Sequence, residues 1–228
     1  MRMTCIVLSI GGSILTPEGT EVEYITKLAE LLKKLSKKHK LYVVVGGGPL
    51  ARKYINIARK LGGNEIKLDE QGIASTRLNA QLLITALDTF AYPKPAETFQ
   101  EAYVQAQNFA IVVMGGTHPG HTTDAVAVML GEFVGAEKFI NVTSVDGVYT
   151  TDPKIDPNAK KLPKLTPDEL IEITSQSASR AGPHIVIDPL AAKIIKRSGI
   201  TTMVLDGRNL EALENAISGK PFEGSVIE

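Results

Sequence analysis

The 228-residue chain contains one cysteine and no tryptophan, and Lys plus Arg balance Asp plus Glu at 25 each. A lone Cys5 excludes an internal disulfide and suits a reducing compartment. Zero net charge argues against bulk attraction to nucleic acid or to a membrane surface. No apolar run approaches the roughly 18 residues of a spanning helix, and the first residues lack the layout of a signal peptide. These absences predict a cytoplasmic protein with no nucleic-acid partner and no membrane partner.

Apolar runs alternate with amphipathic patterns along the chain. Buried strands are predicted at residues 4–10, 41–45, 111–114, 138–143 and 201–205. Helices are predicted at residues 22–35, 50–61, 73–90, 189–198 and 209–217, with a short one starting at Thr166-Pro167-Asp168. Residues 150–167 are predicted as a long surface loop and residues 175–183 as a small, polar, mobile segment. The alternation indicates an α/β fold whose mainly parallel sheet is covered on both faces.

Three of the predicted strands end at glycines: Gly11-Gly12, Gly46 to Gly48, and Gly115-Gly116. One such turn alone is as well explained by a tight connection that needs positive φ. In a parallel sheet, however, the carboxyl ends of the strands meet at one edge, where ligands bind. Free N–H groups in such turns, and at the helix starts that follow, favour anions. The three turns together therefore predict a phosphate site.

The third glycine turn continues through Thr117 to Thr123 into a helix with Asp124 at its start. Its glycine spacing nearly fits a P-loop, but His121 stands where the P-loop lysine belongs, which argues against a Walker-type site. His118 and His121 have the spacing of metal ligands. No further ligand group accompanies them, so a zinc site is disfavoured.

Several polar residues have two open interpretations. Asp69, placed between the second glycine turn and the next helix, is either a helix cap or a ligand contact. Tyr149 and Asp152 fit loop packing and a turn as well as binding. Asp188 precedes a proline, which is typical of an N-cap.

Four segments, at residues 9–13 (SIGGS), 43–48 (VVVGGG), 116–124 (GTHPGHTTD) and 145–153 (VDGVYTTDP), resemble the amino acid kinase family. The resemblance covers essentially the whole chain, and the last two segments resemble the archaeal type of UMP kinase. It implies one domain over residues 1–228, a three-layer α/β/α sandwich in which residues 1–137 bind UMP and residues 138–228 bind ATP. It also implies transfer of the γ-phosphoryl group of ATP to UMP in pyrimidine nucleotide biosynthesis, with Mg2+, by a homohexamer.

The resemblance also implies roles for individual residues. UMP would contact Gly47, Asp69, Thr117, His118, Pro119, Gly120, His121, Thr122 and Thr123. ATP would contact Gly12, Ser13, Gly48, Arg52, Thr143, Tyr149 and Asp152, and Asp188 would organise the site. Many family members carry a lysine where this chain has Ser9. We expect Arg52 first, and Lys193 otherwise, to provide the missing positive charge near the transferring phosphoryl group.

The predicted chemistry needs no general base, because an oxygen of the UMP phosphate is already anionic at neutral pH. The protein has to hold two polyanions in line and offset their repulsion. Mg2+ would take most ligands from phosphates and water, without a dedicated pair of protein carboxylates. Two other functions stay open: a related kinase with an amino-acid, carbamate or isopentenyl-phosphate acceptor, and a nucleotide-binding regulator without catalysis.

Overall fold

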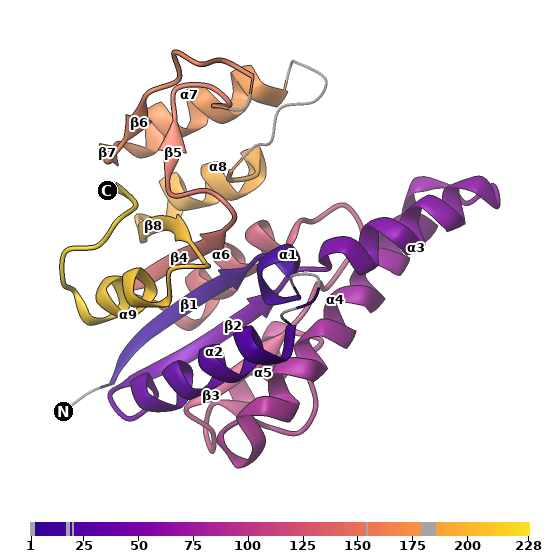
Figure 1. Ribbon diagram of the computed structural model, residues 1–228. Helices are drawn as coiled ribbons and strands as arrows, with labels where there is room; N and C mark the ends of the chain where they lie inside the picture. Colours follow the sequence, from indigo (N-terminus) through magenta and orange to yellow (C-terminus); the bar gives the residue numbers. More distant parts are fainter. Residues whose placement is uncertain (1–2, 17–18, 20, 154, 179–185) are drawn as a thin grey trace.

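The computed structural model describes residues 3–16, 19, 21–153, 155–178 and 186–228 (Figure 1). Within these residues the central sheet has seven strands in the order β3-β2-β1-β4-β8-β9-β7. Their bounds are β1 (Thr4–Ile10), β2 (His39–Val45), β3 (Ile111–Met114), β4 (Lys138–Thr143), β7 (Lys164–Leu165), β8 (Thr201–Asp206) and β9 (Ser225–Ile227). β9 runs antiparallel to β8, whereas the other neighbours in this sheet pair in parallel. The prediction of a mainly parallel sheet is confirmed.

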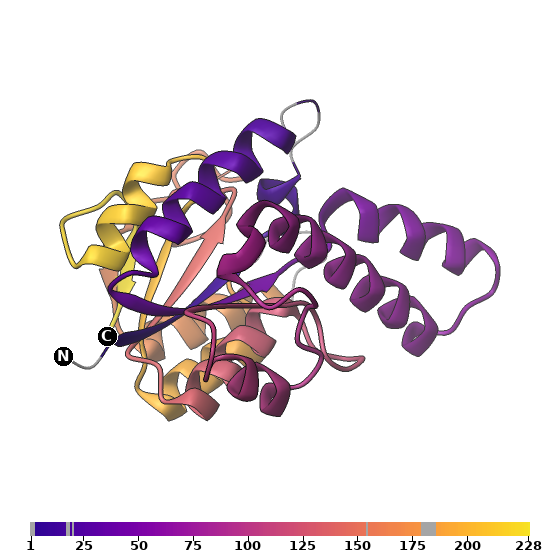
Figure 2. The same cartoon turned by 90° about the horizontal axis from the view of Figure 1, so that it is seen from below.

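Helices cover both faces of this sheet, as Figure 2 shows. One core contains Ile6, Leu8 and Ile10 of β1 together with residues of α2 (Glu21–Leu35), α4 (Glu65–Leu87) and α9 (Leu210–Ser218). The other core contains Val7 of the same strand with residues of α5 (Phe99–Gln105), α6 (Thr123–Val134), α7 (Pro167–Ala178) and α8 (Pro189–Ser198). Because side chains of a strand alternate between faces, β1 contributes to both cores. The three-layer α/β/α architecture is confirmed.

Helix α3 (Gly48–Lys60) and helix α4 form an antiparallel pair that extends beyond the sheet (Figures 1 and 2). α4 begins eight residues before the predicted start at residue 73, because the Asn64 side chain caps it by accepting from the Lys67 N–H at 3.1 Å. The placement of Asp69 before the helix is therefore wrong: it lies inside α4. Among the described helices, none has both the length and the apolar character needed to cross a membrane.

The prediction of one long loop over residues 150–167 is wrong in part. β5 (Val148–Tyr149) and β6 (Lys161–Leu162) form an antiparallel pair, and β7 joins the main sheet beside β9. Two-residue strands carry too little periodicity to be recognised in a sequence. α1 (Gly12–Leu15) and η1 (Asp88–Phe90), a 3-10 turn, are also short additions. Of the segment predicted as mobile, residues 175–178 belong to α7, and residues 179–183 lie outside the described residues.

The sheet register brings the three glycine turns to one edge. Ile10 pairs with Val45, and Val44 pairs with Met114, so β1, β2 and β3 end side by side. The turns that follow them begin at Gly11, Gly46 and Gly115. The convergence predicted from the sequence is therefore present.

The two sides of α2 should differ sharply in their contribution to stability. Leu32 is fully buried in the core, whereas Val22 is 81% exposed. Leu32→Ala should lower the free energy of unfolding by about 2–5 kcal/mol, through lost burial and a residual cavity. Val22→Ala on the same helix should change it by less than about 0.5 kcal/mol. Urea titrations of both variants measure the difference, and equal losses would contradict this packing.

Candidate functional site

The site is built on direct contact between the first two glycine turns. A Cβ added at Gly12 would lie 2.2 Å from the Gly48 nitrogen and 2.5 Å from the Gly46 oxygen. One added at Gly48, where φ is +58°, would lie 2.5 Å from the Gly12 carbonyl carbon. These neighbours are backbone atoms that no side-chain rotation can move aside. Only glycine allows the ends of β1 and β2 to meet in this way.

A cleft of about 260 Å3 opens along these two turns and the start of α6. Its lining residues are Gly11, Gly12, Ser13, Ile14, Gly46, Gly47, Gly48, Arg52, Thr123, Asp124, Asn141, Thr143, Ser144 and Val186. Gly47 and Thr123 from the predicted UMP set thus lie in the same cleft as five residues of the predicted ATP set: Gly12, Ser13, Gly48, Arg52 and Thr143. The Arg52 Nη2 donates to the Ser13 Oγ at 3.3 Å, which places its positive charge beside the first glycine turn.

The segment from Thr117 to Thr123 runs from the third glycine turn into α6. The Thr122 Oγ1 caps this helix by accepting from the Ala125 N–H at 3.2 Å, so the positive end of the helix dipole faces the cleft. Asp69 of α4 accepts a hydrogen bond from the Gly120 N–H at 2.7 Å. The structure therefore brings the Asp69 side chain to the predicted UMP segment, where it contacts the backbone of Gly120.

Of the predicted UMP segment, Thr123 lines the cleft, whereas Thr117, His118, Pro119, Gly120, His121 and Thr122 do not. Both histidines are exposed. Within the described part of the chain, no group of three or more His, Cys, Asp or Glu side chains is close enough to hold a metal ion. The paired histidines therefore have no further protein ligand there.

Asp188 acts as the N-cap of α8, as its position before Pro189 predicted. Its Oδ1 accepts from the Leu190 N–H at 2.7 Å. Its Oδ2 accepts from the Thr122 Oγ1 at 2.6 Å, and this second bond connects α8 to the start of α6. Asp188 is not among the residues that line the cleft.

Tyr149 and Asp152 also lie outside the cleft lining. The Tyr149 hydroxyl donates to the Asp146 Oδ1 at 2.9 Å, and the Lys161 Nζ contacts the Asp146 Oδ2 at the same distance. This network fixes the β5–β6 pair beyond the end of β4. The family resemblance assigns Thr143, Tyr149 and Asp152 to the adenosine part of ATP, and of these three only Thr143 lines the cleft.

Sequence reasoning missed a polar cluster around Asp124. The Ser9 Oγ donates to the Asp124 Oδ1 at 2.7 Å, and the Asn141 Nδ2 approaches its Oδ2 at 3.5 Å. Burial raises the pKa of Asp124 to about 6, and the charge of Asp188 acts in the same direction, while the bonds from Ser9 and Asn141 oppose both. Ser9 and Asp124 are 115 residues apart in the sequence, so no local pattern indicates their contact. The one sequence signal for Asp124 is its position in the first turn of α6.

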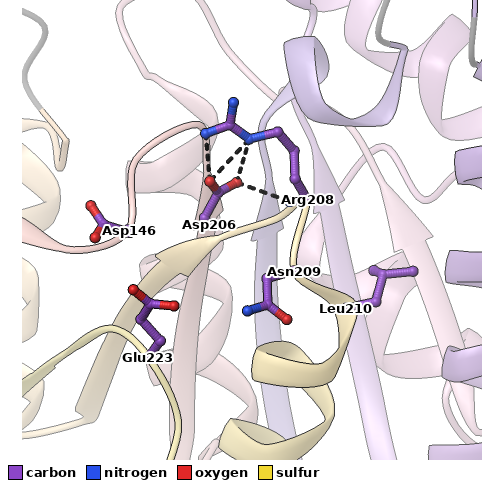
Figure 3. A pocket seen from close by; sticks show the side chains of 6 residues that line it. All are labelled: Asp146, Asp206, Arg208, Asn209, Leu210 and Glu223. Atoms are coloured by element: carbon purple, nitrogen blue, oxygen red, sulfur yellow. Dashed lines mark hydrogen bonds and ion pairs between the residues drawn. The ribbon is translucent and has the colours of Figure 1, made fainter.

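A larger hollow, of about 570 Å3, lies beside Asp146 in the turn after β4 (Figure 3). It is lined by Asp146, Asp206, Arg208, Asn209, Leu210 and Glu223. The Arg208 Nε contacts both carboxylate oxygens of Asp206, at 2.9 and 3.0 Å, and its charge is therefore already paired. Because two further carboxylates, Asp146 and Glu223, line the hollow beside this Asp206–Arg208 pair, the hollow disfavours polyphosphate. The smaller glycine cleft has one carboxylate and fits an anion better.

The family model described as "Amino acid kinase family" matches residues 4–206. A uridylate kinase of Pyrococcus abyssi is 51% identical over 223 residues, which cover 98% of this chain and 99% of that relative. The crystal structure of uridylate kinase from Archaeoglobus fulgidus superposes with a TM-score of 0.88 at 48% identity, covering 98% of this chain and 99% of that one. The structure of UMP kinase from Ureaplasma parvum, 24% identical over the full length of both chains, shares the fold with a TM-score of 0.82.

The raised pKa of Asp124 should be visible in the pH dependence of stability. Its ordinary value is 3.8 and its folded value about 6, so between these the folded state keeps a proton that the unfolded state has released. The contribution of this group to stability therefore falls as pH rises from about 4 to about 6 and is constant above that window. Asp124→Asn removes this contribution. Urea unfolding of both proteins across the window should give curves that diverge with rising pH, and parallel curves would contradict the assignment.

Proposed function

Because the chain belongs to the amino acid kinase family, we infer from its full-length similarity to uridylate kinases that it transfers the γ-phosphoryl group of ATP to UMP, giving UDP and ADP. It is an ATP-dependent nucleoside monophosphate kinase. The observation that carries this reading in the structure is the cleft where the two glycine turns meet the start of α6. Backbone N–H groups and a helix N-terminus converge there, as recognition of phosphate requires.

The proposed orientation places UMP toward α4 and α6, and ATP toward β4. Support comes from Asp69, which contacts the Thr117 to Thr123 segment and has a second carboxylate oxygen for the ribose hydroxyls. Ser13, Gly48 and Thr143, which the family resemblance assigns to ATP, line the cleft itself. UMP would be held mainly by residues 1–137, and ATP by residues 138–228 together with the first two glycine turns and Arg52. We propose Tyr149 and Asp152 for the adenosine, reached along the turn after β4.

The protein's part in the reaction is positioning and charge stabilisation. The attacking oxygen of the UMP phosphate is already anionic, so no side chain has to remove a proton. Glycine amides and the start of α6 would hold the two phosphate chains in line, and Arg52 would stabilise negative charge on the transferring group. Ser9, where many family members have a lysine, instead donates its hydroxyl to Asp124. The positive charge must therefore come from elsewhere in the cleft.

Mg2+ is proposed as the metal, since it binds oxygen ligands and keeps several from phosphate and water. The cleft fits this, because it offers one carboxylate, Asp124, and the hydroxyls of Ser13 and Thr143. A bound Mg2+ would supply positive charge that offsets the repulsion between the two phosphate groups. Asp188 would act indirectly, by holding the Thr122 side chain at the start of α6.

A homohexamer is proposed for the assembly. Large apolar side chains stand exposed along the α3–α4 pair: Tyr54, Ile57, Leu61, Ile66, Leu78 and Leu82. An apolar surface of this extent on a projecting element favours contact with another copy of the chain. We place the enzyme in the cytoplasm, acting in pyrimidine nucleotide biosynthesis.

A phosphoryl-transfer assay with ATP and each of UMP, CMP, dTMP and AMP tests the proposed reaction. UDP should form much faster than the other diphosphates. Isopentenyl phosphate, carbamate and amino-acid acceptors belong in the same assay, because the family includes such kinases. Preference for one of these would overturn the proposal, and nucleotide binding without any product would indicate a regulator instead.

Arg52 supplies the sharpest prediction about the reaction. Arg52→Ala should lower kcat by about two to four decades, because losing a contact to a charged transition state costs about 3–5 kcal/mol. Arg52→Lys should recover only part of this, since lysine lacks the bidentate fork. Steady-state kinetics with saturating UMP and ATP measure both effects.

The matched control is the neighbouring Lys53, which is exposed and is not part of the cleft lining. Lys53→Ala should leave kcat nearly unchanged, because its side chain points roughly 100° further around the helix. A normal kcat in Arg52→Ala, combined with a large loss in Lys193→Ala, would move the catalytic charge to α8.

A further inference from the structure

We propose that Asn79 of α4 is a positioning residue, which turns the Gly47 and Gly48 amide groups away from α4 so that they can donate to phosphate. This inference rests on the proposed phosphoryl transfer in the glycine cleft. Asn79 does not line the cleft, and it would act through the backbone of the second glycine turn.

The contact is specific and buried. The Asn79 Nδ2 donates to the Gly46 oxygen at 2.9 Å and to the Gly47 oxygen at 3.1 Å. The side chain is 2% exposed, so water does not compete for these bonds. Carbonyl oxygens only accept, and therefore the amide nitrogen of Asn79, not its oxygen, must face the turn. One side chain thus holds two successive carbonyl groups.

Holding these two carbonyls also fixes the two following N–H groups. Gly46 C=O and Gly47 N–H belong to one planar peptide unit, as do Gly47 C=O and Gly48 N–H, and in a trans peptide the two groups point in opposite directions. Among the described residues no cis peptide bond occurs. With both carbonyls turned toward α4, both N–H groups point away from it. No hydrogen bond from either N–H to another described residue is present, and both glycines line the cleft.

A glycine turn needs such an external restraint. Gly47 adopts φ −82° and ψ −27°, and Gly48 has φ +58°, a value that glycine reaches as easily as negative φ. Without side chains of their own, these residues have access to more backbone conformations than other residues do, so the turn depends on its surroundings to select one. The Gly47 oxygen also accepts from the Ala51 N–H at 3.2 Å, whereas Asn79 provides the bond to the Gly46 oxygen. Loss of the Asn79 bonds would therefore free the Gly46–Gly47 peptide unit and leave the Gly47–Gly48 unit with the Ala51 bond alone, even if the fold around them persisted.

The same helix also holds the third glycine turn. The Thr76 Oγ1 accepts from the Gly116 N–H at 2.7 Å, and the Arg77 Nε donates to the Gly116 oxygen at 3.3 Å. Asp69 adds its contact to the Gly120 N–H. α4 thus sets the turn after β2 relative to the turn after β3. The bonds from Asn79 differ from the others because they reach the second glycine turn. This turn contains both Gly47, the proposed UMP contact, and Gly48, the proposed ATP contact.

The test compares Asn79→Ala and Asn79→Ser with Ser75→Ala. Ser75 lies on the same helix, is 6% exposed, and donates only to its own helix, at the Gln71 oxygen. At a temperature where all variants are folded, Asn79→Ala should raise the dissociation constants of both ATP and UMP at least about tenfold in calorimetry, corresponding to ~1.4 kcal/mol each. It should also lower kcat. Asn79→Ser, which keeps one donor, should show a smaller loss of the same kind and decides the case if the alanine variant does not fold.

Ser75→Ala should lose some thermal stability but keep wild-type affinities and kcat. The proposal is overturned if the Asn79 variants show reduced stability alone, with nucleotide affinities and kcat equal to those of Ser75→Ala. Failure of the proposed reaction gives a different pattern, because the wild-type protein would then form no UDP. In that event the change in nucleotide affinity still tests the role of Asn79.

Discussion

The whole site depends on the contact between two backbones with no side chain between them. Gly12 sits against Gly46, Gly47 and Gly48 so closely that one added carbon at Gly12 would overlap three backbone atoms. This contact follows from the pairing of β1 with β2, which ends both strands at the same level. It brings the first glycine turn directly beside the second. Such an arrangement would allow two polyphosphate groups to be held near each other by backbone N–H groups, which are polar but carry no net charge.

Few charged side chains lie around this contact. Arg52 lies at the first turn, the start of α6 contributes its dipole, and the one carboxylate in the cleft, Asp124, has its pKa raised by burial. The bond from Ser9 satisfies one oxygen of that carboxylate without adding a positive charge. α4 holds the surrounding turns through Asp69, Thr76 and Asn79. The cleft is thus lined by backbone turns that α4 holds in place, with Arg52 and no lysine among its lining residues.

Much of this arrangement could be predicted from the sequence, because its signals are local. The β3 and β4 boundaries, the glycine turns and the cap at Asp188 depend on neighbouring residues. The start of α4 was misplaced, since it is defined by a cap and not by apolar periodicity. The bonds of Asn79 to Gly46 and Gly47, and of Ser9 to Asp124, join residues 32 to 115 positions apart. No spacing rule reveals such contacts.

Nucleotide binding by Gly12→Ala, with Gly11→Ala as the control, tests the central contact most directly. A Cβ at Gly11 would meet its nearest neighbour, the Val142 oxygen, at 3.5 Å, and Gly11 has φ −56°, so alanine fits there. Gly12→Ala should weaken both ATP and UMP binding by about tenfold to a hundredfold, because forcing the turns apart costs roughly 1–3 kcal/mol. Gly11→Ala should bind both nearly as the wild type does. Unchanged affinity of a folded Gly12→Ala protein for both nucleotides would contradict the account.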